Sequence, residues 1–282
     1  MHENEFDELE YPEGYTGNPR LDFEGFSPFE MHFLLYAPFY ANSPLVLGTA
    51  LGDVGGVSYL RDIVCYLDHI NVSSPLKLTQ KGNLPPSFCR ELVEMKIGEG
   101  GQWSTGKWVL NREDDSYYIS LIDTMTRKLR FVTKRKNKLS VSKKGFMFLS
   151  WGNVRKFHEL FKYYVREFNW GYSDLYPESW IIQGGFAYTL FLLQKYGDEW
   201  RGSDYYAKRY RIAFPTILPD FRKQTHTPPV KAFENAYQTR VVERFLGRFG
   251  LAEKREVGTG YIKDIELRKT PLLDRFVKWD RE

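Results

Sequence analysis

The sequence predicts a mainly α-helical fold with small β-hairpins (α+β), organised as two tandem units of one kind. Two observations carry this prediction. Amphipathic segments with helix-start signals occupy most of the chain, and a series of helix, stop, hairpin and capped helix occurs twice. The chain has 282 residues, of which 17% are aromatic, so it can bury a sizeable core.

Charge is distributed unevenly along the chain. Residues 1–25 contain one base, Arg20, and eight acids: Glu3, Glu5, Asp7, Glu8, Glu10, Glu13, Asp22 and Glu24. Because the whole chain has a net charge of +4, the remainder is strongly basic, with 39 bases against 28 acids. A basic body suits a polyanionic partner. We expect residues 1–26 to form a flexible acidic arm, either a solvated tail or a competitor for the basic surface.

Residues 27–56 are predicted to form a lead-in helix and a connector. Ser27 is placed as the N-cap, Pro28 as the first helical residue and Glu30 as the third, which is the pattern of a capping box. The glycine-rich stretch "LGTALGDVGG" follows. It lacks G-x-G-x-x-G spacing, so it does not predict a dinucleotide site.

The first unit is predicted over residues 57–150. It begins with a helix from Ser58, followed by a strand around Leu76 and Leu78 that ends in a turn at Gly82 and Asn83. Two helices come next, the first opened by Pro85 and Pro86 and the second capped by Asp114 or Asp115. A hairpin with its tip at Lys134–Lys138 and a helix from Ser142 complete the unit. That order, helix, strand, helix, helix, hairpin, is the order of a winged helix, in which a wing lies beside the third helix.

The second unit is predicted over residues 180–282, after a linking helix and loop over 151–179. Its first helices are "WIIQGGFAYTLFLLQKYG" and "SDYYAKRYRIAF", and its next helix ends at Gly250 before a hairpin. A capped helix at Thr270 and Pro271 follows the hairpin. When the second unit is aligned with the first, Val132 matches Ala252, so the residue numbers differ by an offset of 120. Leu139–Val141 aligns with Ile265–Leu267, an offset of 126, which predicts a second wing six residues longer than the first.

Two stretches carry a resemblance to known proteins. "PLKLTQKGNLPPSFCREL" resembles an uncharacterised bacterial module found with plasmid pRiA4b ORF-3-like and mobile-element proteins. "LIDTMTRKLRFVTKRKNKLSVSKKGFMFL" is similar to the third helix and wing of many winged-helix regulators, including the T/S-x-K-G signal that Ser142 to Gly145 match. The resemblance covers roughly residues 57–150. It implies a fold and a bacterial origin, and no defined activity.

Nucleotide binding and catalysis are not predicted. "GQWSTGKW" (residues 101–108) comes close to a phosphate-binding loop, but Trp108 stands where a magnesium-binding Ser or Thr is needed. The five histidines are scattered, and C-x-x-C, H-E-x-x-H and G-x-S-x-G are absent. We therefore expect no enzyme, no cofactor and no metal. Without a long apolar run or an export signal, we expect a cytoplasmic protein that does not associate with a membrane.

Nine bases and no acid lie between Arg127 and Lys144, and they predict DNA binding. Burial of Ile122, Met125 and Leu129 would expose Asp123 and Thr124 on the third helix, with Thr124 near base edges. The predicted nucleic-acid contacts are Thr124, Arg127, Lys128, Lys134, Arg135, Lys136 and Lys138 in the first unit, and Arg240 and Arg244 in the second.

The alternative is a winged-helix module for protein–protein interaction or dimerisation without DNA binding. Lysine-rich hairpin tips also serve as soluble edges that resist pairing, and the second hairpin mixes both signs of charge. The aromatic and basic helix "SDYYAKRYRIAF" has two interpretations as well. Its bases and tyrosines could bind a nucleic acid, or Tyr206, Tyr210 and Phe214 could line the core, which the helical spacing favours.

Overall fold

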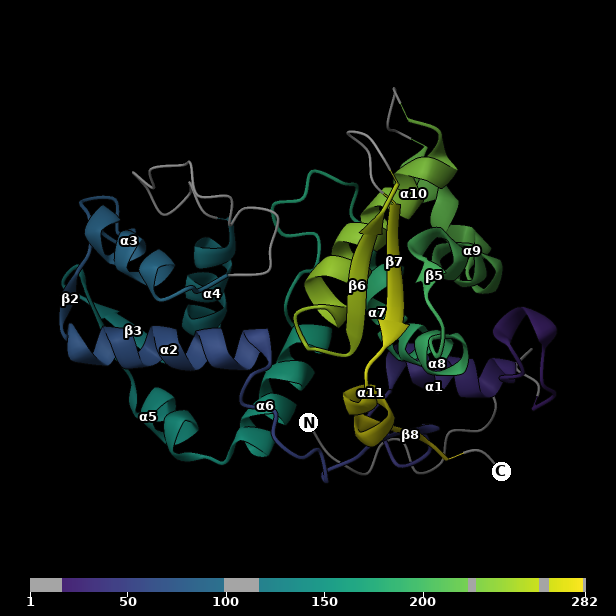
Figure 1. Cartoon of the computed structure of the whole chain (residues 1–282), viewed down its shortest axis with the longest axis horizontal. Coiled ribbons are helices and arrows are strands. Elements are labelled where there is room, and N and C mark those ends of the chain that lie inside the picture. Colours follow the sequence, from purple (N-terminus) through teal and green to yellow (C-terminus); the bar gives the residue numbers. More distant parts are fainter. Residues whose placement is uncertain (1–16, 99–116, 223–226, 259–263, 281–282) are drawn as a thin grey trace. The chain divides into compact units, whose positions relative to one another are not determined.

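The computed structural model describes residues 17–98, 117–222, 227–258 and 264–280 (Figure 1). The chain divides into two compact units. Unit 1 comprises residues 1–51 and 169–282, and unit 2 comprises residues 52–168. This division differs from the predicted boundaries, because the lead-in helix belongs with the C-terminal elements and the helix after residue 151 belongs to unit 2.

Unit 2 contains five helices and three strands among its described residues. In chain order they are α2 (Ser58–Val72), β2 (Leu76–Lys77), α3 (Pro86–Glu94), α4 (Tyr117–Lys128), β3 (Val132–Arg135), β4 (Lys138–Val141), α5 (Lys143–Ser150) and α6 (Asn153–Arg166). Helix α2 forms because its apolar residues recur at helical spacing. The side chains of Leu60, Ile63, Leu67 and Ile70 are at most 1% exposed and pack in the core of the unit.

The three strands of unit 2 form one antiparallel sheet in the order β2-β4-β3. Strands β3 and β4 are joined by a two-residue turn at Lys136 and Asn137, both with positive φ (47° and 57°). Such turns match the right-handed twist of a hairpin. The Asn137 side-chain amide donates to the carbonyls of Leu78 and Thr79 at 3.1 and 2.8 Å, which fastens the turn to the segment after β2.

Unit 1 is built from the two ends of the chain. Its elements are η1 (Leu21–Phe23), α1 (Pro28–Tyr36), β1 (Leu45–Leu47), α7 (Trp180–Gly184), α8 (Phe186–Tyr196), β5 (Arg201–Gly202), α9 (Ser203–Ala213), η3 (Pro215–Phe221), α10 (Pro229–Tyr237), the π-helical segment η4 (Gln238–Leu246), β6 (Ala252–Val257), β7 (Asp264–Lys269), α11 (Pro271–Phe276) and β8 (Val277–Trp279). The predicted capping box of α1 is confirmed. Ser27 Oγ accepts from the Glu30 amide at 3.1 Å, and the Ser27 amide donates to Glu30 at 2.6 Å.

Long-range pairing explains why the lead-in segment belongs to unit 1. Strand β1 pairs antiparallel with β8, with Leu45 opposite Trp279 and Leu47 opposite Val277. Helix α1 packs against α7 and α8. Burying these faces removes apolar surface from water, which holds the N-terminal segment on the C-terminal elements.

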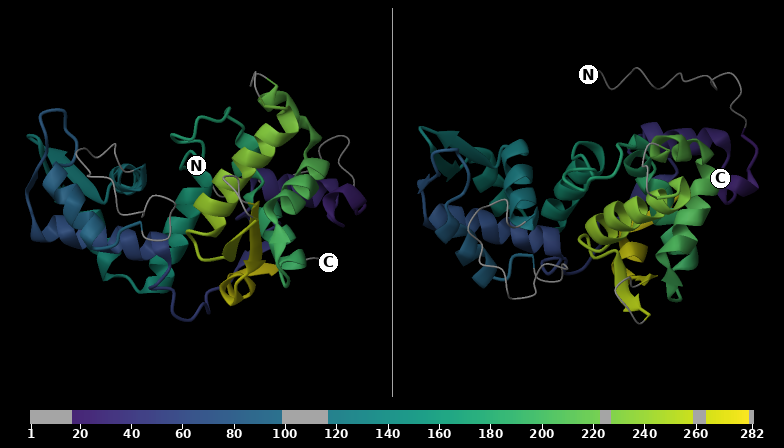
Figure 2. Two further views of the ribbon diagram at one scale, coloured as in Figure 1. Left: turned by 45° about the horizontal axis from the view of Figure 1, so that its top comes forward. Right: turned by 90° about the horizontal axis from the view of Figure 1, so that it is seen from above.

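The second sheet has the same order as the first. Strands β6 and β7 lie side by side as a long hairpin (Figure 1), seen from two further sides in Figure 2. The short strand β5 pairs with the other edge of β7 and gives the order β5-β7-β6. Each unit thus contains a helix, a strand, two or more further helical segments, a hairpin and a helix after it, in that order.

Matching hydrogen bonds fix which residues of the two units correspond. The Ser142 hydroxyl donates to the Arg130 carbonyl at 2.6 Å, and the Thr270 hydroxyl donates to the Gly250 carbonyl at 2.7 Å. Arg130 and Gly250 both have a left-handed backbone, with φ of 59° and 64°. The predicted offset of 120 is therefore confirmed before the hairpin.

The predicted offset of 126 after the hairpin is wrong. Ser142 corresponds to Thr270, and the two sheet registers make Lys138 correspond to Glu266, so the offset is 128. The second wing is longer than the first by eight residues. Apolar side chains alternate along both strands, so a shift by two residues keeps every side chain on its face, and the apolar pattern alone does not distinguish the two alignments.

The fold class is mixed α and β, mainly helical with small antiparallel sheets, as predicted. No helix among the described residues is long and apolar enough to cross a membrane.

Candidate nucleic-acid interface

Three cations lie in one row across the sheet of unit 2. Lys138 on the central strand β4 lies directly opposite Lys77 of β2 on one side and opposite Arg135 of β3 on the other. Residues directly opposite each other in an antiparallel pair point to the same face of the sheet. All three side chains are exposed, and none of them forms an ion pair with any residue that the structure describes.

Hydroxyl-bearing side chains form the next row of the same face. Ser140 lies opposite Thr133, and its hydroxyl is 3.3 Å from that of Ser74. Ser140 and Thr133, together with Pro75, Arg135, Lys136 and Lys138, line a shallow concavity of the surface. Lysine and arginine at the rim and hydroxyl groups at the base are the groups that contact phosphate oxygens in protein–DNA interfaces.

The four predicted wing cations do not share one face. Lys134 lies opposite Leu139, on the face that packs on the rest of the unit, and its side chain extends over the backbone of Gly82, where a Cβ would collide with the ammonium. Lys136 lies in the turn. The structure therefore brings Arg135 and Lys138 together, adds Lys77, and separates Lys134 from them.

The hairpin of unit 1 has complementary charges at the corresponding positions. Arg255 corresponds to Arg135, and it forms an ion pair at 2.6 Å with Glu266, which corresponds to Lys138. Arg268 pairs with Glu253 at 2.7 Å on the same hairpin. Both guanidinium groups also lie over the ring of Trp200, 4.6 and 5.0 Å from its centroid. The hairpin of unit 1 thus neutralises its own charge, whereas the hairpin of unit 2 does not.

No family model, no curated protein and no solved structure matches this chain.

The prediction that Asp123 is exposed on α4 is wrong. Asp123 is 4% exposed, accepts a hydrogen bond from the hydroxyl of Tyr66, and pairs with Arg127 at 2.6 Å. Arg127 lies one helical turn after Asp123 and neutralises this buried carboxylate. The guanidinium of Arg127 is therefore less available to a phosphate. Thr124 is half-buried, whereas Lys128 is exposed at the end of the helix.

Arg240, a predicted nucleic-acid contact, does not lie on an exposed helix face. Arg240 is 2% exposed and forms two hydrogen bonds with Asp174, at 2.6 and 3.0 Å. It also donates to the carbonyls of Tyr176 and Pro177, at 3.2 and 3.0 Å. This buried guanidinium holds the loop before α7 against η4 and is inaccessible to an external anion.

Arg244 also holds the loop before α7. Its guanidinium donates to the carbonyls of Trp170 and Tyr172, at 3.2 and 2.8 Å, and lies 3.7 Å from Asp174. The two arginines of unit 1 assigned to nucleic acid are therefore part of the internal structure of that unit.

Lys77 is the cation of this row that the sequence did not predict. Its strand has two residues, and its place beside β4 depends on pairing with a segment about sixty positions later in the chain. The signal available in the sequence was the alternation of Leu76, Lys77 and Leu78, which puts Lys77 on the polar face of a strand.

Some sequence candidates lie outside the described residues, namely residues 101–108, Asp114 and Asp115. In the helix "SDYYAKRYRIAF", Tyr206 and Tyr210 are buried, as their spacing predicted, and Arg209 lies between the rings of Tyr196 and Tyr205, 4.5 and 4.3 Å from their centroids. Within the described ranges, no group of three or more His, Cys, Asp or Glu residues is placed to hold a metal ion.

Proposed function

We propose that unit 2 is a winged-helix module that binds duplex DNA without catalysing a reaction. Its order of elements supports the winged-helix assignment. A helix and a strand are followed by two helices and a two-stranded hairpin, and the first strand completes the sheet beside β4. Unit 1 repeats this order, with a hairpin whose charges are paired internally.

The row formed by Lys77, Lys138 and Arg135 is the observation that carries the DNA-binding proposal. Like charges directly opposite each other across strands destabilise a sheet. Among the described residues, no acid forms an ion pair with any of these three cations, whereas Glu266 pairs with Arg255 at the corresponding position of unit 1. A polyanion supplies the missing negative charge from outside. DNA presents one phosphate for about every 1.7 Å of helix axis, so it can reach several cations of the row at once.

Fluorescence anisotropy with a labelled DNA duplex, titrated at several salt concentrations, tests the proposal. Lys77, Arg135 and Lys138 are changed together to Ala. The control changes Lys208, Arg222 and Lys231 of unit 1 to Ala and removes the same amount of charge. Each lost phosphate contact lowers the slope of log affinity against log salt by about 0.9. We therefore expect a slope reduced by two to three in the row variant (about 0.9 per contact) and little change in the control.

Two results would refute DNA binding by this face. One is the absence of binding by the wild-type chain at low salt. The other is an equal loss of affinity in the row variant and the control, because total charge and not the row would then account for binding. Circular dichroism of both variants verifies that the fold is retained.

One observation favours the alternative, a module that docks a protein or a second copy of the chain. Phe146 and Met147 are adjacent on α5 and are each 49% exposed. Neighbouring exposed apolar side chains are common in protein–protein interfaces. Changing both to Ser and measuring mass by light scattering tests this alternative. A dimer of the wild-type chain that dissociates in the variant supports it, and a monomeric wild-type chain counts against dimerisation.

A further inference from the structure

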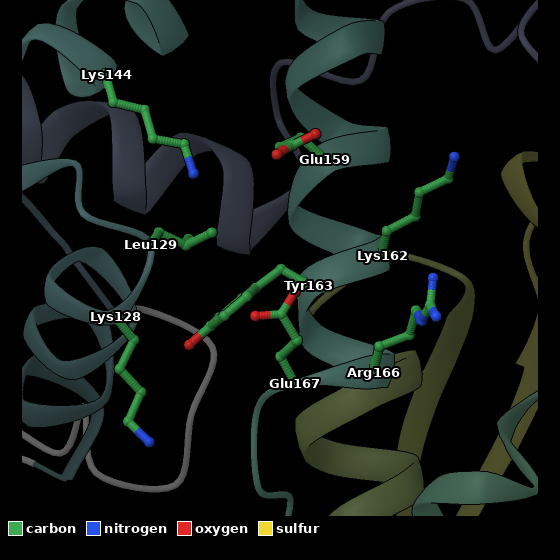
Figure 3. Close-up of a pocket in the computed structure, with 8 residues that line it drawn as sticks. All are labelled: Lys128, Leu129, Lys144, Glu159, Lys162, Tyr163, Arg166 and Glu167. Atoms are coloured by element: carbon green, nitrogen blue, oxygen red, sulfur yellow. The ribbon is translucent and has the colours of Figure 1, made fainter. Parts of the chain in front are cut away.

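A second polar pocket lies within unit 2, away from the row of cations on the sheet. It is formed by the end of α4, by α5 and by α6, and it is lined by Lys128, Leu129, Lys144, Glu159, Lys162, Tyr163, Arg166 and Glu167 (Figure 3). Glu159, Tyr163 and Glu167 are spaced four residues apart, so α6 presents them along one face.

Tyr163 is a buried donor without a partner. Its side chain is 6% exposed, and its hydroxyl forms no hydrogen bond with any residue that the structure describes. Leaving a buried hydroxyl unsatisfied costs on the order of 1–3 kcal/mol, so such a group marks a place where an external acceptor would be stabilised. Burial, with a smaller contribution from Glu167, raises the pKa of Tyr163 to about 12. The phenol therefore remains protonated at neutral pH and can donate.

Charges of opposite sign face each other across this pocket without meeting. Lys128 and Lys144 come from α4 and α5, Glu159 comes from α6, and Glu167 directly follows α6. Lys162 and Arg166 of α6 also line the pocket, but in Figure 3 their side chains extend away from Tyr163. In the described part of the chain, no ion pair within 4 Å joins these lysines to these glutamates, although unit 1 closes two such pairs across its hairpin. In Figure 3 the ring of Tyr163 extends from α6 toward Lys128, and its hydroxyl points to the side of the pocket that carries Lys128.

From this arrangement we propose that the pocket binds a small zwitterion of the α-amino acid class. The ligand carboxylate accepts hydrogen bonds from the Tyr163 hydroxyl and from the ammonium groups of Lys128 and Lys144. The ligand ammonium lies between the carboxylates of Glu159 and Glu167. It also lies near the aromatic ring of Tyr163, which attracts cations.

The presence of both signs distinguishes this ligand from a simple anion. A phosphate or a lone carboxylate would satisfy the lysines and Tyr163, but it would lie near two carboxylates that repel it. A ligand with an ammonium group converts that repulsion into attraction. The inference does not depend on DNA binding, because it rests on a different surface of unit 2.

Thermal unfolding and isothermal titration calorimetry of the full chain test this site. Each of the standard amino acids is added singly, with acetate, methylamine and inorganic phosphate as probes that carry one sign of charge. We expect at least one amino acid to raise the melting temperature and to bind measurably, and the single-charge probes to bind at least ten-fold more weakly.

Variants locate the binding within the pocket. Tyr163→Phe removes only the hydroxyl, and the loss of an unpaired buried polar group leaves the fold at least as stable. Tyr163→Phe, Lys144→Met and Glu167→Gln should each weaken binding of the identified amino acid by about ten-fold, the effect of one charged hydrogen bond. Lys143→Met, next to Lys144 but outside the lining, should leave binding unchanged.

Three results would overturn the proposal. The first is that no amino acid binds. The second is that phosphate or acetate binds as tightly as the best amino acid, which would indicate a plain anion site. The third is that binding persists unchanged in Tyr163→Phe and Glu167→Gln, which would place the ligand elsewhere.

Discussion

Arg135 lies directly opposite Lys138 across β3 and β4, whereas the corresponding Arg255 of unit 1 lies opposite Glu266 and pairs with it at 2.6 Å. The two hairpins thus share a register and differ in the sign of one charge. Lys138 also lies opposite Lys77, so a single position controls two cross-strand contacts of the basic row.

Lys138→Glu should make unit 2 more stable and abolish its affinity for DNA. The new carboxylate would face Arg135 and Lys77 and replace two repulsive cross-strand contacts by attractive ones, a gain of about 1 kcal/mol. The urea midpoint should rise, while anisotropy with a DNA duplex should show little binding.

Lys136→Glu is the matched control for this prediction. It makes the same change in net charge at the turn, where no cation of the row lies opposite. DNA binding should weaken without a rise in the urea midpoint. If Lys138→Glu destabilises the protein, the side chains of the row do not face one another as the register indicates.

Arg240→Met should destabilise unit 1 severely. The substitution keeps the approximate length of the side chain but leaves Asp174, which is 1% exposed, without its closest cation. Removing one partner of a buried ion pair costs about 3–5 kcal/mol. Urea denaturation should show this loss, and Arg222→Met, at an exposed position, should show almost none.

A second substitution separates charge from packing in this pair. Adding Asp174→Asn to Arg240→Met removes the buried negative charge and should restore part of the lost stability. Equal stability of the single and double variants would mean that the contacts of Arg240 with the carbonyls of Tyr176 and Pro177 matter more than the ion pair.

The starts and ends of many helices in this fold follow from local sequence signals. The capping box at Ser27, the apolar face of α2 and the glycine that ends the last helical segment before β6 each involve residues within a few positions of one another. Short-range signals of this kind determine where a helix starts and stops. The predicted winged-helix order was obtained in the same way.

The features that the sequence did not predict depend on distant partners. Tyr66 lies 57 positions before Asp123, and Asp174 lies 66 positions before Arg240. Helical periodicity assigns such polar residues to the exposed face by default, because a buried charge is costly unless a partner meets it. The pairing of β1 with β8 joins opposite ends of the chain, which no local pattern indicates.

Glu24 fastens the N-terminal segment of unit 1 and should make its attachment sensitive to acid. Glu24 accepts hydrogen bonds from the Lys195 ammonium and the Tyr196 hydroxyl, at 2.9 and 2.5 Å, and Arg209 lies 3.8 Å away. Burial alone would raise the pKa of Glu24, but the hydrogen bonds from Tyr196 and Lys195 and the nearby positive charges lower it below the ordinary 4.5.

Because the pKa of Glu24 is lower in the folded than in the unfolded chain, its ionised form stabilises the fold at any pH above about 4.5. This contribution disappears as the pH falls through the depressed folded value. Glu24→Gln should therefore lower the urea midpoint at about pH 7, by an amount that corresponds to roughly 1 kcal/mol or less for a partly exposed pair, and should have a smaller effect at about pH 3. Glu94→Gln, which changes an exposed carboxylate of α3, is the control. A difference between wild type and Glu24→Gln that is the same at both pH values would show that the carboxylate acts by its shape and hydrogen bonds and not by its charge.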